Sequence, residues 1–155
     1  MGKETETYID LGLPSGILWA GENSILDGSD LMTLGSAARA FGASLPTWGD
    51  FQELITSCAH RYDPERAGTL FTGRNGSELF FPSDRMAAYV QEDDNGNSGY
   101  IEPQGFSRYW SGTPLDGRHT NFWCLIVQEN LNACGFPYKR EDMYHARLVK
   151  RPAAR

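Results

Sequence analysis

Three histidines and a few serines are the side chains of this 155-residue chain that could do nucleophilic or acid–base chemistry. Ser15 and Ser111 have no histidine at a spacing typical of a nucleophile and its base, and the chain lacks GxSxG, P-loop, HExxH and GxGxxG motifs. A hydrolase would need a pocket in which His119 or His145 meets a carboxylate at hydrogen-bond distance. The pattern therefore favours a protein that is not an enzyme, without catalytic residues, and a hydrolase is its third alternative.

Metal-ligating residues are equally sparse. Cys58, Cys124 and Cys134 have no CxxC spacing, so no zinc site is predicted. The acidic stretch EDDNGNSG at 92–99 offers oxygen ligands but lacks the order of an EF-hand loop, and we expect an exposed loop there. No metal and no cofactor is expected. Cys124 and Cys134 could form one disulfide or remain buried thiols, and the sequence leaves both open.

The stretch from Tyr109 to the end of the chain has the composition that is most suggestive of binding. Large rings alternate there with amide and charged groups, a mixture typical of recognition surfaces. The rings are Tyr109, Trp110, Phe122, Trp123, Phe136, Tyr138 and Tyr144, and the polar groups include Asn121, Asn130, Asn132, Arg140 and Asp142. Alternating aromatics in strands are also typical of a core. Because Phe122 and Trp123 point to opposite faces of a strand, either the sheet is covered on both sides or one set of rings faces outward.

Two helices are predicted in the first half of the chain. Apolar residues recur at helical spacing between Asp30 and Phe41, with Asp30 as the N-cap candidate and Gly42 as the stop signal. A second helix begins after the N-cap candidate Thr47. Its inward stripe consists of Phe51, Leu54, Ile55 and Cys58.

Strands are predicted on either side of these helices. The stretch YIDLGLPSGILWA, from Tyr8 to Ala20, is expected to form a hairpin-like corner with positive-φ glycines, in which the indole N–H of Trp19 meets a buried acceptor. Asn75-Gly76 predicts a hairpin turn between two short strands. The expected strands are 70–72, 78–81, 109–111, 121–128 and 144–150. Two helices and mainly antiparallel strands predict an α+β fold.

Charge and composition exclude some classes of partner. The net charge of -6 and pI ≈ 5.0, without a Lys/Arg stripe, argue against nucleic-acid binding. No apolar run is long enough to span a bilayer, so we expect no membrane insertion. The polar start MGKETETYID lacks the apolar core of a signal peptide, which predicts a soluble chain unless a leader was left off. We expect one domain over residues 8–150, with flexible termini at 1–7 and 151–155.

Five sequence motifs occur in order across nearly the whole chain: DLGLPSGILWA (10–20), LPTWGDFQELITSC (45–58), FTGRNGSELFFP (71–82), YWSGTP (109–114) and HARLV (145–149). Together they resemble the FISUMP family, the major paralogous domain of gut and rumen bacteria. The chain departs from the family pattern at HARLV, which lacks the usual proline, at YWSGT, and over 21–42.

The resemblance implies a C-type-lectin-like fold, with two helices packed on mainly antiparallel strands and an irregular C-terminal half that displays a ligand surface. It also implies a cell-surface or secreted location, whereas a cytoplasmic or phage-associated location is the alternative. Some relatives are variable proteins of diversity-generating retroelements. Carried over, their variable region gives these candidate ligand contacts: Tyr109, Asp116, Arg118, Asn121, Trp123, Asn130, Asn132, Tyr138, Arg140, Asp142 and Tyr144.

The sequence therefore favours a non-enzymatic module that binds a protein or a glycan through its C-terminal aromatic and polar surface. An intracellular interaction or assembly protein is the competing hypothesis. The oligomeric state cannot be read from the residues.

Overall fold

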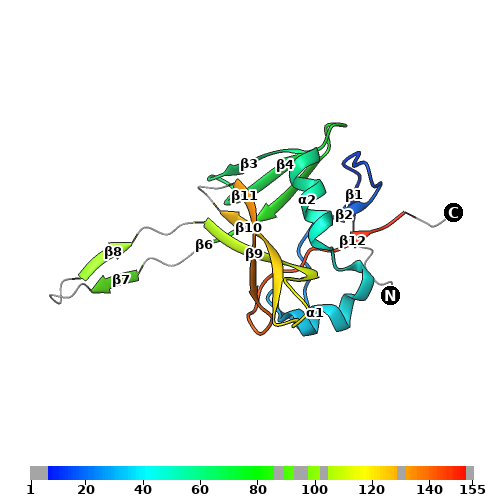
Figure 1. Cartoon of the computed structure of the whole chain (residues 1–155). Coiled ribbons are helices and arrows are strands. Elements are labelled where there is room, and N and C mark those ends of the chain that lie inside the picture. Colours follow the sequence, from blue (N-terminus) through cyan, green and yellow to red (C-terminus); the bar gives the residue numbers. More distant parts are fainter. Residues whose placement is uncertain (1–6, 86–88, 93–97, 102–104, 129–131, 153–155) are drawn as a thin grey trace.

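The chain is α+β, with two α-helices and antiparallel strands (Figure 1). The computed structural model describes residues 7–85, 89–92, 98–101, 105–128 and 132–152. For those of them that fall within 84–106 and 132–134, it describes the backbone but not the side chains. The helices are α1 (Leu34–Phe41), the 3-10 turn η1 (Gly42–Ser44) and α2 (Trp48–Ser57). The strands are β1 (Tyr8–Ile9), β2 (Leu18–Ala20), β3 (Ala59–Asp63), β4 (Gly68–Thr72), β5 (Glu78–Pro82), β6 (Asp84–Arg85), β7 (Tyr89–Glu92), β8 (Ser98–Ile101), β9 (Gly105–Pro114), β10 (Asn121–Gln128), β11 (Asn132–Lys139) and β12 (Val149–Lys150).

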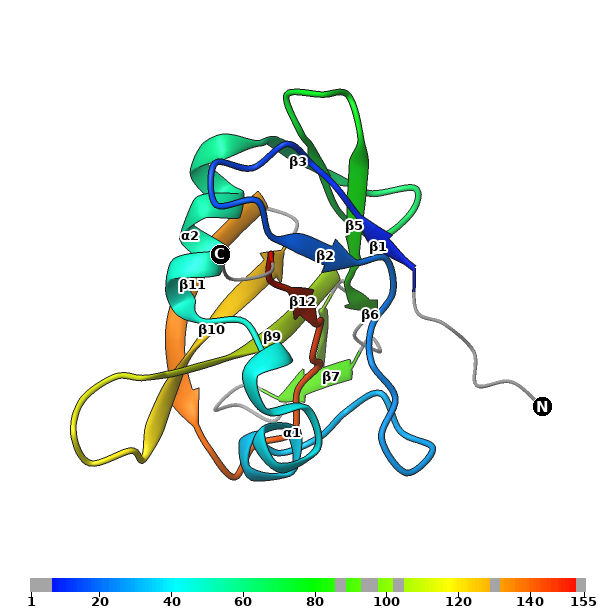
Figure 2. The same cartoon turned by 90° about the vertical axis from the view of Figure 1, so that its right-hand side faces the viewer.

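The strands form three sheets and one separate hairpin. In the sheet β1-β2-β12 the first and last strands of the chain pair with the two edges of β2, as Figure 2 shows. The second sheet has the order β11-β10-β9-β6, and the third has the order β3-β4-β5. The hairpin β7-β8 stands away from the rest of the molecule (Figure 1).

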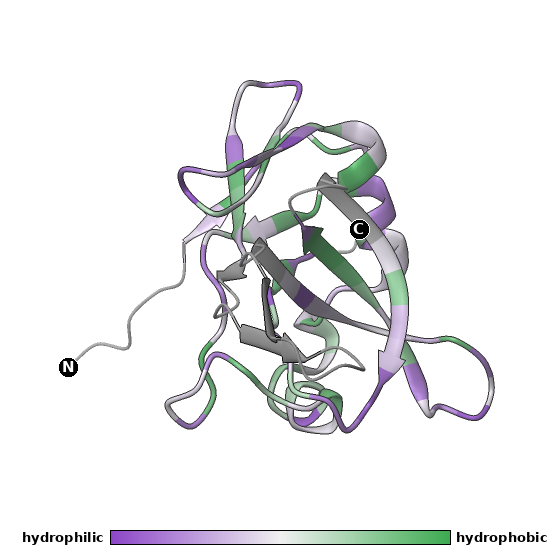
Figure 3. Ribbon diagram, turned by 90° about the vertical axis from the view of Figure 1, so that its left-hand side faces the viewer, coloured by the Kyte–Doolittle hydropathy of each residue, from purple (hydrophilic) through white to green (hydrophobic). Residues whose placement is uncertain are grey.

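The four-stranded sheet lies between two apolar clusters. Figure 3 shows β10 in its middle, apolar along most of its length. Leu125 and Val127 of β10 join the cluster that contains Phe51 of α2, whereas Phe122 and Cys124 join the cluster below α1. Because side chains alternate along a strand, β10 buries both of its faces. The middle of the sheet is therefore covered on both sides, whereas toward β11 the ring of Phe136 faces outward and is 56% exposed, so each of the two readings of the tail aromatics holds for part of the sheet.

Both predicted helices form, and their ends follow from local hydrogen bonds. Thr47 caps α2 as predicted: its side chain accepts from the Asp50 N–H, and the Asp50 carboxylate accepts from the Thr47 N–H, which completes a capping box. Gly42 ends α1 as predicted. The N-cap of α1, however, is Thr33 and not Asp30, because the Thr33 hydroxyl accepts from the Ser36 N–H.

The predicted hairpins also form, although some strand lengths differ. The turn with Asn75-Gly76 connects β4 and β5, and Gly76 has φ 87. β9 is longer than the three residues expected. The expected strand at 144–150 is reduced to β12, preceded by single bridges at Tyr144 and His145. Part of the expected loop at 92–99 belongs to β7 and β8, and 93–97 lie outside the described residues.

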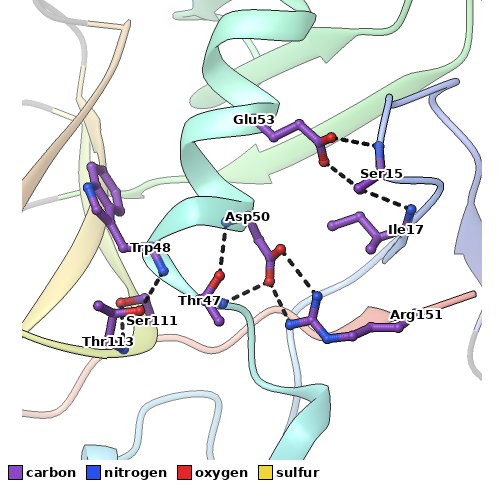
Figure 4. A network of polar contacts seen from close by, with 9 residues as sticks. All are labelled: Ser15, Ile17, Thr47, Trp48, Asp50, Glu53, Ser111, Thr113 and Arg151. Carbon is purple, nitrogen blue, oxygen red and sulfur yellow. Dashed lines mark hydrogen bonds and ion pairs between the residues drawn. The ribbon is translucent and has the colours of Figure 1, made fainter.

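The stretch 8–20 forms the predicted corner, and polar contacts fix it to α2. Gly12 and Gly16 have φ 71 and 79, as expected for this turn. Ser15 donates from its backbone N–H and its hydroxyl to the two carboxylate oxygens of Glu53, at 2.8 and 2.7 Å (Figure 4). The motifs DLGLPSGILWA and LPTWGDFQELITSC therefore contact each other.

Arg151 extends this network to the first turn of α2. Its Nη1 and Nη2 donate to the two oxygens of Asp50 at 3.2 and 2.7 Å (Figure 4). The flexibility of 151–155 stays a prediction: Arg151 forms this ion pair with α2, and 153–155 and 1–6 lie outside the described residues. Burial acts to raise the pKa of Asp50, but hydrogen bonds from Arg151 and Thr47 outweigh it and the pKa lies below its ordinary value.

The most deeply buried charged side chain is Arg147, which is 1% exposed. Its Nε and Nη2 donate to Asn23 Oδ1 at 3.0 and 2.6 Å, its Nη1 to the Ala20 carbonyl at 3.2 Å, and its Nη2 to the Phe80 carbonyl at 2.9 Å. The guanidinium also lies over the Phe81 ring, 4.5 Å from the centroid. One side chain thus joins β2, β5 and the C-terminal segment.

One core prediction is wrong. Trp19 is fully buried as expected, packed against Phe51 and Phe81. Its indole N–H, however, has no hydrogen-bond acceptor among the residues that the structure describes. The surrounding side chains are apolar rings, so the close packing of this cluster excludes an acceptor.

Replacing Arg147 with methionine should lower the free energy of unfolding by roughly 3 kcal/mol, because two buried carbonyls and the Asn23 amide would lose their donors. Urea denaturation followed by circular dichroism measures the change. Arg151→Met, at a half-exposed guanidinium, is the control and should cost clearly less. Equal losses in the two variants would contradict the role given to Arg147.

Asp50→Asn should weaken the fold at neutral pH and flatten its acid dependence. A carboxylate with a lowered pKa contributes stability that is present above the unfolded-state pKa of about 3.9 and is lost as pH falls through the folded-state pKa. We expect a loss of about 1 kcal/mol at pH 7, as for other N-terminal caps. The difference from wild type should shrink below about pH 4. Melting temperatures between pH 2 and 8 test this, with the exposed Glu141→Gln as the control.

Candidate functional site

A group of aromatic and cationic side chains lies on the α1-side face of the four-stranded sheet. The rings of Phe136 and Tyr138 meet edge to face at 5.5 Å, and those of Tyr138 and Tyr144 at 5.4 Å. The Arg108 guanidinium lies 4.3 Å from the Tyr138 centroid and 5.0 Å from that of Tyr144. We call the set Phe136, Tyr138, Tyr144, Arg108 and Arg140 the cation–aromatic stripe.

The strand register explains why these residues share one face. Tyr138 lies opposite Phe122, and Phe136 lies opposite Cys124. Arg108 of β9 lies opposite Ile126, two residues further along β10. Because residues two apart on a strand point the same way, all of these side chains project from one side of the sheet. Tyr144 joins them through its antiparallel bridge with Met32, which precedes α1.

Arg140 extends the stripe to the other end of β10. Its backbone N–H donates to the Thr120 carbonyl at 3.0 Å, and its Nη1 donates to the His119 carbonyl at 3.2 Å. Its guanidinium lies 6.0 Å from the centroid of Phe122, the cross-strand partner of Tyr138. The cations therefore flank the rings at both ends.

Exposure varies along the stripe. Phe136 is 56% exposed, Tyr138 and Tyr144 are half-buried, and Arg140 is exposed. The Tyr144 hydroxyl donates to Asp142 Oδ2 at 2.9 Å. Burial and this hydrogen bond raise the pKa of Tyr144, so the phenol stays neutral at physiological pH. The result is a partly apolar surface on which the Phe136 ring and the Arg140 guanidinium are exposed.

Four of the predicted contacts belong to this region: Tyr138, Arg140, Asp142 and Tyr144. Asp116 and Arg118 lie in the exposed turn between β9 and β10, where the Arg118 N–H donates to Asp116 Oδ1 at 2.9 Å. Asn121 is half-buried at the start of β10. Only the backbone of Asn132 is described, in β11, and Asn130 lies outside the described residues.

Tyr109 is a wrong prediction, because its side chain is fully buried. Its hydroxyl donates to the Pro82 carbonyl and accepts from Asn23 Nδ2 at 3.2 Å. The ring packs edge to face on Phe81 at 4.9 Å. The alternation along β9 sends Tyr109 into the α2-side cluster, so its ring belongs to the core and cannot touch a ligand.

Trp123 lies on the opposite face of the sheet from the stripe. Its ring stacks on Trp48 of α2, with centroids 5.3 Å apart and an interplanar angle of 13°. Both rings are half-buried. Trp48 lies directly over Gly135 of β11, where a Cβ would overlap its ring. Trp123 therefore takes part in attaching α2 to the sheet and does not extend the stripe.

The thiols and histidines show no arrangement typical of catalysis. Burial raises the pKa of both Cys58 and Cys124, which makes them poor nucleophiles at neutral pH. Cys124 is a free thiol whose cross-strand partner is Phe136. His145 is buried, with Nδ1 2.9 Å from the Asp30 carbonyl but 3.9 Å from Asp30 Oδ2, beyond hydrogen-bond distance to that carboxylate. Among the described residues, no three His, Cys, Asp or Glu side chains could hold a metal ion.

Sequence reasoning missed Arg108 and Phe136 as members of the stripe. It also missed Arg39, whose Nη1 lies 3.8 Å from the position that a Cβ on Gly35 would take, with Arg140 Nη2 3.9 Å from the same position. Arg108 was missed because the predicted strand begins at Tyr109. A longer strand would have placed Arg108 on the same face as Trp110, two residues further along. Phe136 was counted among the tail aromatics, but the register that exposes it comes from pairing with β10. Arg39 lies in α1, and no pattern along the chain connects it with Arg140.

Comparison with family models, curated proteins and solved structures finds no match for this chain. Within the described residues, no helix has the length and apolar character needed to cross a membrane.

Gly135→Ala should disturb the stacked pair on the α2 side. The new methyl group would overlap the Trp48 ring, and such overpacking costs about 1–3 kcal/mol. We expect a lower melting temperature together with altered tryptophan fluorescence. Gly112→Ala on β9 is the control, because its nearest neighbour would be Leu45 Cδ2 at 3.6 Å, an ordinary contact. An unchanged spectrum and melting temperature for Gly135→Ala would show that Trp48 does not need this glycine.

Proposed function

We propose that the chain is a non-enzymatic ligand-binding module and that the cation–aromatic stripe contacts its ligand. The observation that carries this proposal is the exposed ring of Phe136, held beside Tyr138 and Tyr144 while Arg108 packs against the latter two. Exposed aromatic side chains next to arginine are typical of the centres of recognition surfaces. The ligand class proposed from the sequence is a protein or a glycan.

The rigidity of the stripe supports this role. Each of its tyrosines packs against another ring and a guanidinium, so little side-chain freedom remains to be lost when a ligand binds. Aromatic side chains provide large contact areas at a low entropic cost. Covering Phe136 would also remove apolar area from water, at about 25 cal/mol per Å².

We also propose the finer fold and the family that the motifs suggest. A C-type-lectin-like arrangement is supported by the sheet β1-β2-β12, which joins both ends of the chain, and by two helices placed between the first and the later strands. The FISUMP motifs meet in space at Ser15 and Glu53, consistent with a shared frame. By this analogy the protein acts at a cell surface or after secretion.

Phe136→Ser is the sharpest test of the proposed surface, because this ring is exposed and its loss should leave the fold intact. Wild type and variant are compared on a glycan array and against a displayed peptide library. We expect binding by wild type and at least a tenfold loss in the variant, or about 1.4 kcal/mol.

Ile25→Ser, which removes another exposed apolar side chain far along the sequence, is the control and should bind like wild type. Tyr138→Ala provides a second variant within the stripe, with its melting temperature measured alongside. Equal binding by wild type and both stripe variants would refute the proposed surface, as would wild type that binds neither probe set.

A further inference from the structure

Cations gather along the stripe although the whole chain carries a formal net charge of -6. Arg108 covers the tyrosines, and Arg140 lies at the Phe122 end. Arg39 of α1 adds a third guanidinium. Its Nη1 lies 3.8 Å from the position that a Cβ on Gly35 would take, and Arg140 Nη2 lies 3.9 Å from the same position. One nitrogen from each of two guanidinium groups, which are far apart in the sequence, therefore lies within 3.9 Å of this position.

This convergence has an electrostatic cost. Like charges at short range repel, and an anion placed between them removes the repulsion. In the part of the chain that the structure describes, no ion pair joins Arg39 or Arg140 to a carboxylate. Arg140 donates instead to the neutral carbonyl of His119. The donors that face this point are thus available to an external anion.

The nearby carboxylates do not remove this preference. Asp142 accepts the hydroxyl hydrogen of Tyr144, and Asp116 accepts the backbone N–H of Arg118. Glu141 follows Arg140 in the chain and is exposed. These three carboxylates reduce the local net positive charge. An acidic ligand would be repelled where it approached them. Arg108 lies over the tyrosines, and Arg39 and Arg140 both approach Gly35, so three guanidinium groups remain in this region.

We infer that the ligand is an acidic segment of a partner protein, whose carboxylates meet Arg39 and Arg140 and whose apolar side chains pack on Phe136. The inference rests on the proposed function and deepens it. Guanidinium groups bind carboxylates with charge-assisted, often bidentate hydrogen bonds. A phenylalanine ring offers no hydrogen bond, and Met143, next to Tyr144, is 53% exposed. An exposed apolar ring and thioether suit the side chains of a peptide better than the hydroxyl groups of a sugar.

The experiment selects binders from a random twelve-residue peptide library displayed on phage, with the full chain as the target. We expect the selected sequences to be enriched in Asp and Glu beside aromatic or aliphatic residues. Synthetic versions of the best peptides are then titrated against wild type, Arg39→Glu/Arg140→Glu and Phe136→Ser. Asn/Gln versions of the same peptides test the contribution of their carboxylates.

The charge-reversed double variant should bind the acidic peptides at least tenfold more weakly, and wild-type affinity should fall as salt rises from 50 to 300 mM. Arg61→Glu/Arg74→Glu is the matched control, because it reverses two exposed charges in β3 and the β4–β5 turn. Melting temperatures of all variants confirm folding.

Selected peptides without acidic enrichment, or with equal affinity for the Arg39→Glu/Arg140→Glu variant, would overturn the acidic ligand. If Phe136→Ser still abolished their binding, the proposed function would stand while this inference fell. Binding that neither variant changes would contradict both. Acidic glycans bound on an array at the stripe, with no peptide selected, would show that the ligand is a sugar and would also overturn the inference.

Discussion

The buried guanidinium of Arg147 is the constraint on which the rest of the structure depends. A charge placed in an apolar interior must be hydrogen-bonded. The acceptors for Arg147 come from Ala20 and Asn23, which are near each other in the sequence, and from Phe80, which is far from both. Satisfying it fixes the C-terminal segment against β2 and β5 at the same time. Two residues earlier, His145 exchanges backbone hydrogen bonds with Arg108 and Trp110 of β9. The buried contacts of Arg147 and His145 therefore fix the segment that places the Tyr144 ring on the sheet face.

The four-stranded sheet separates supporting residues from exposed ones by alternation alone. Tyr109 and Trp110 are neighbours on β9 and are both buried, one in each cluster. Both faces are covered near the middle of β10, and among the side chains that the structure describes, the exposed ring of this sheet, Phe136, lies on the edge strand β11 beside the half-buried Tyr138. The stripe is rigid, because each exposed ring packs against a ring that is partly or wholly buried. It is also small, which fits contact through one short segment.

Local signals in the sequence predicted much of the frame. The cap at Thr47, the stop at Gly42 and the Asn75-Gly76 turn depend on residues within a few positions of one another, so they could be read directly. The α+β class followed from their order. The site could not be read in the same way, since the exposure of Phe136 depends on the pairing of β11 with β10, and the burial of Tyr109 depends on packing against Phe81. Arg39 and Arg140 are a hundred residues apart, and no pattern along the chain connects them. Trp19 shows a different limit, because its aromatic neighbours exclude the acceptor that its chemistry favours.

The net charge of the chain and the local charge of the stripe act over different distances. At physiological ionic strength the Debye length is about 8 Å, so exposed carboxylates beyond that range contribute little to the potential at Arg140. Arg39 Nη1 and Arg140 Nη2 lie 3.8 and 3.9 Å from one position beside Gly35, so these two guanidinium groups act within this distance. An acidic partner would meet weak repulsion on approach and attraction only on contact. For such a partner, the net negative charge would slow association with other faces of the molecule. Selectivity would then depend on the rings and guanidinium groups of the stripe, which the fold holds in place.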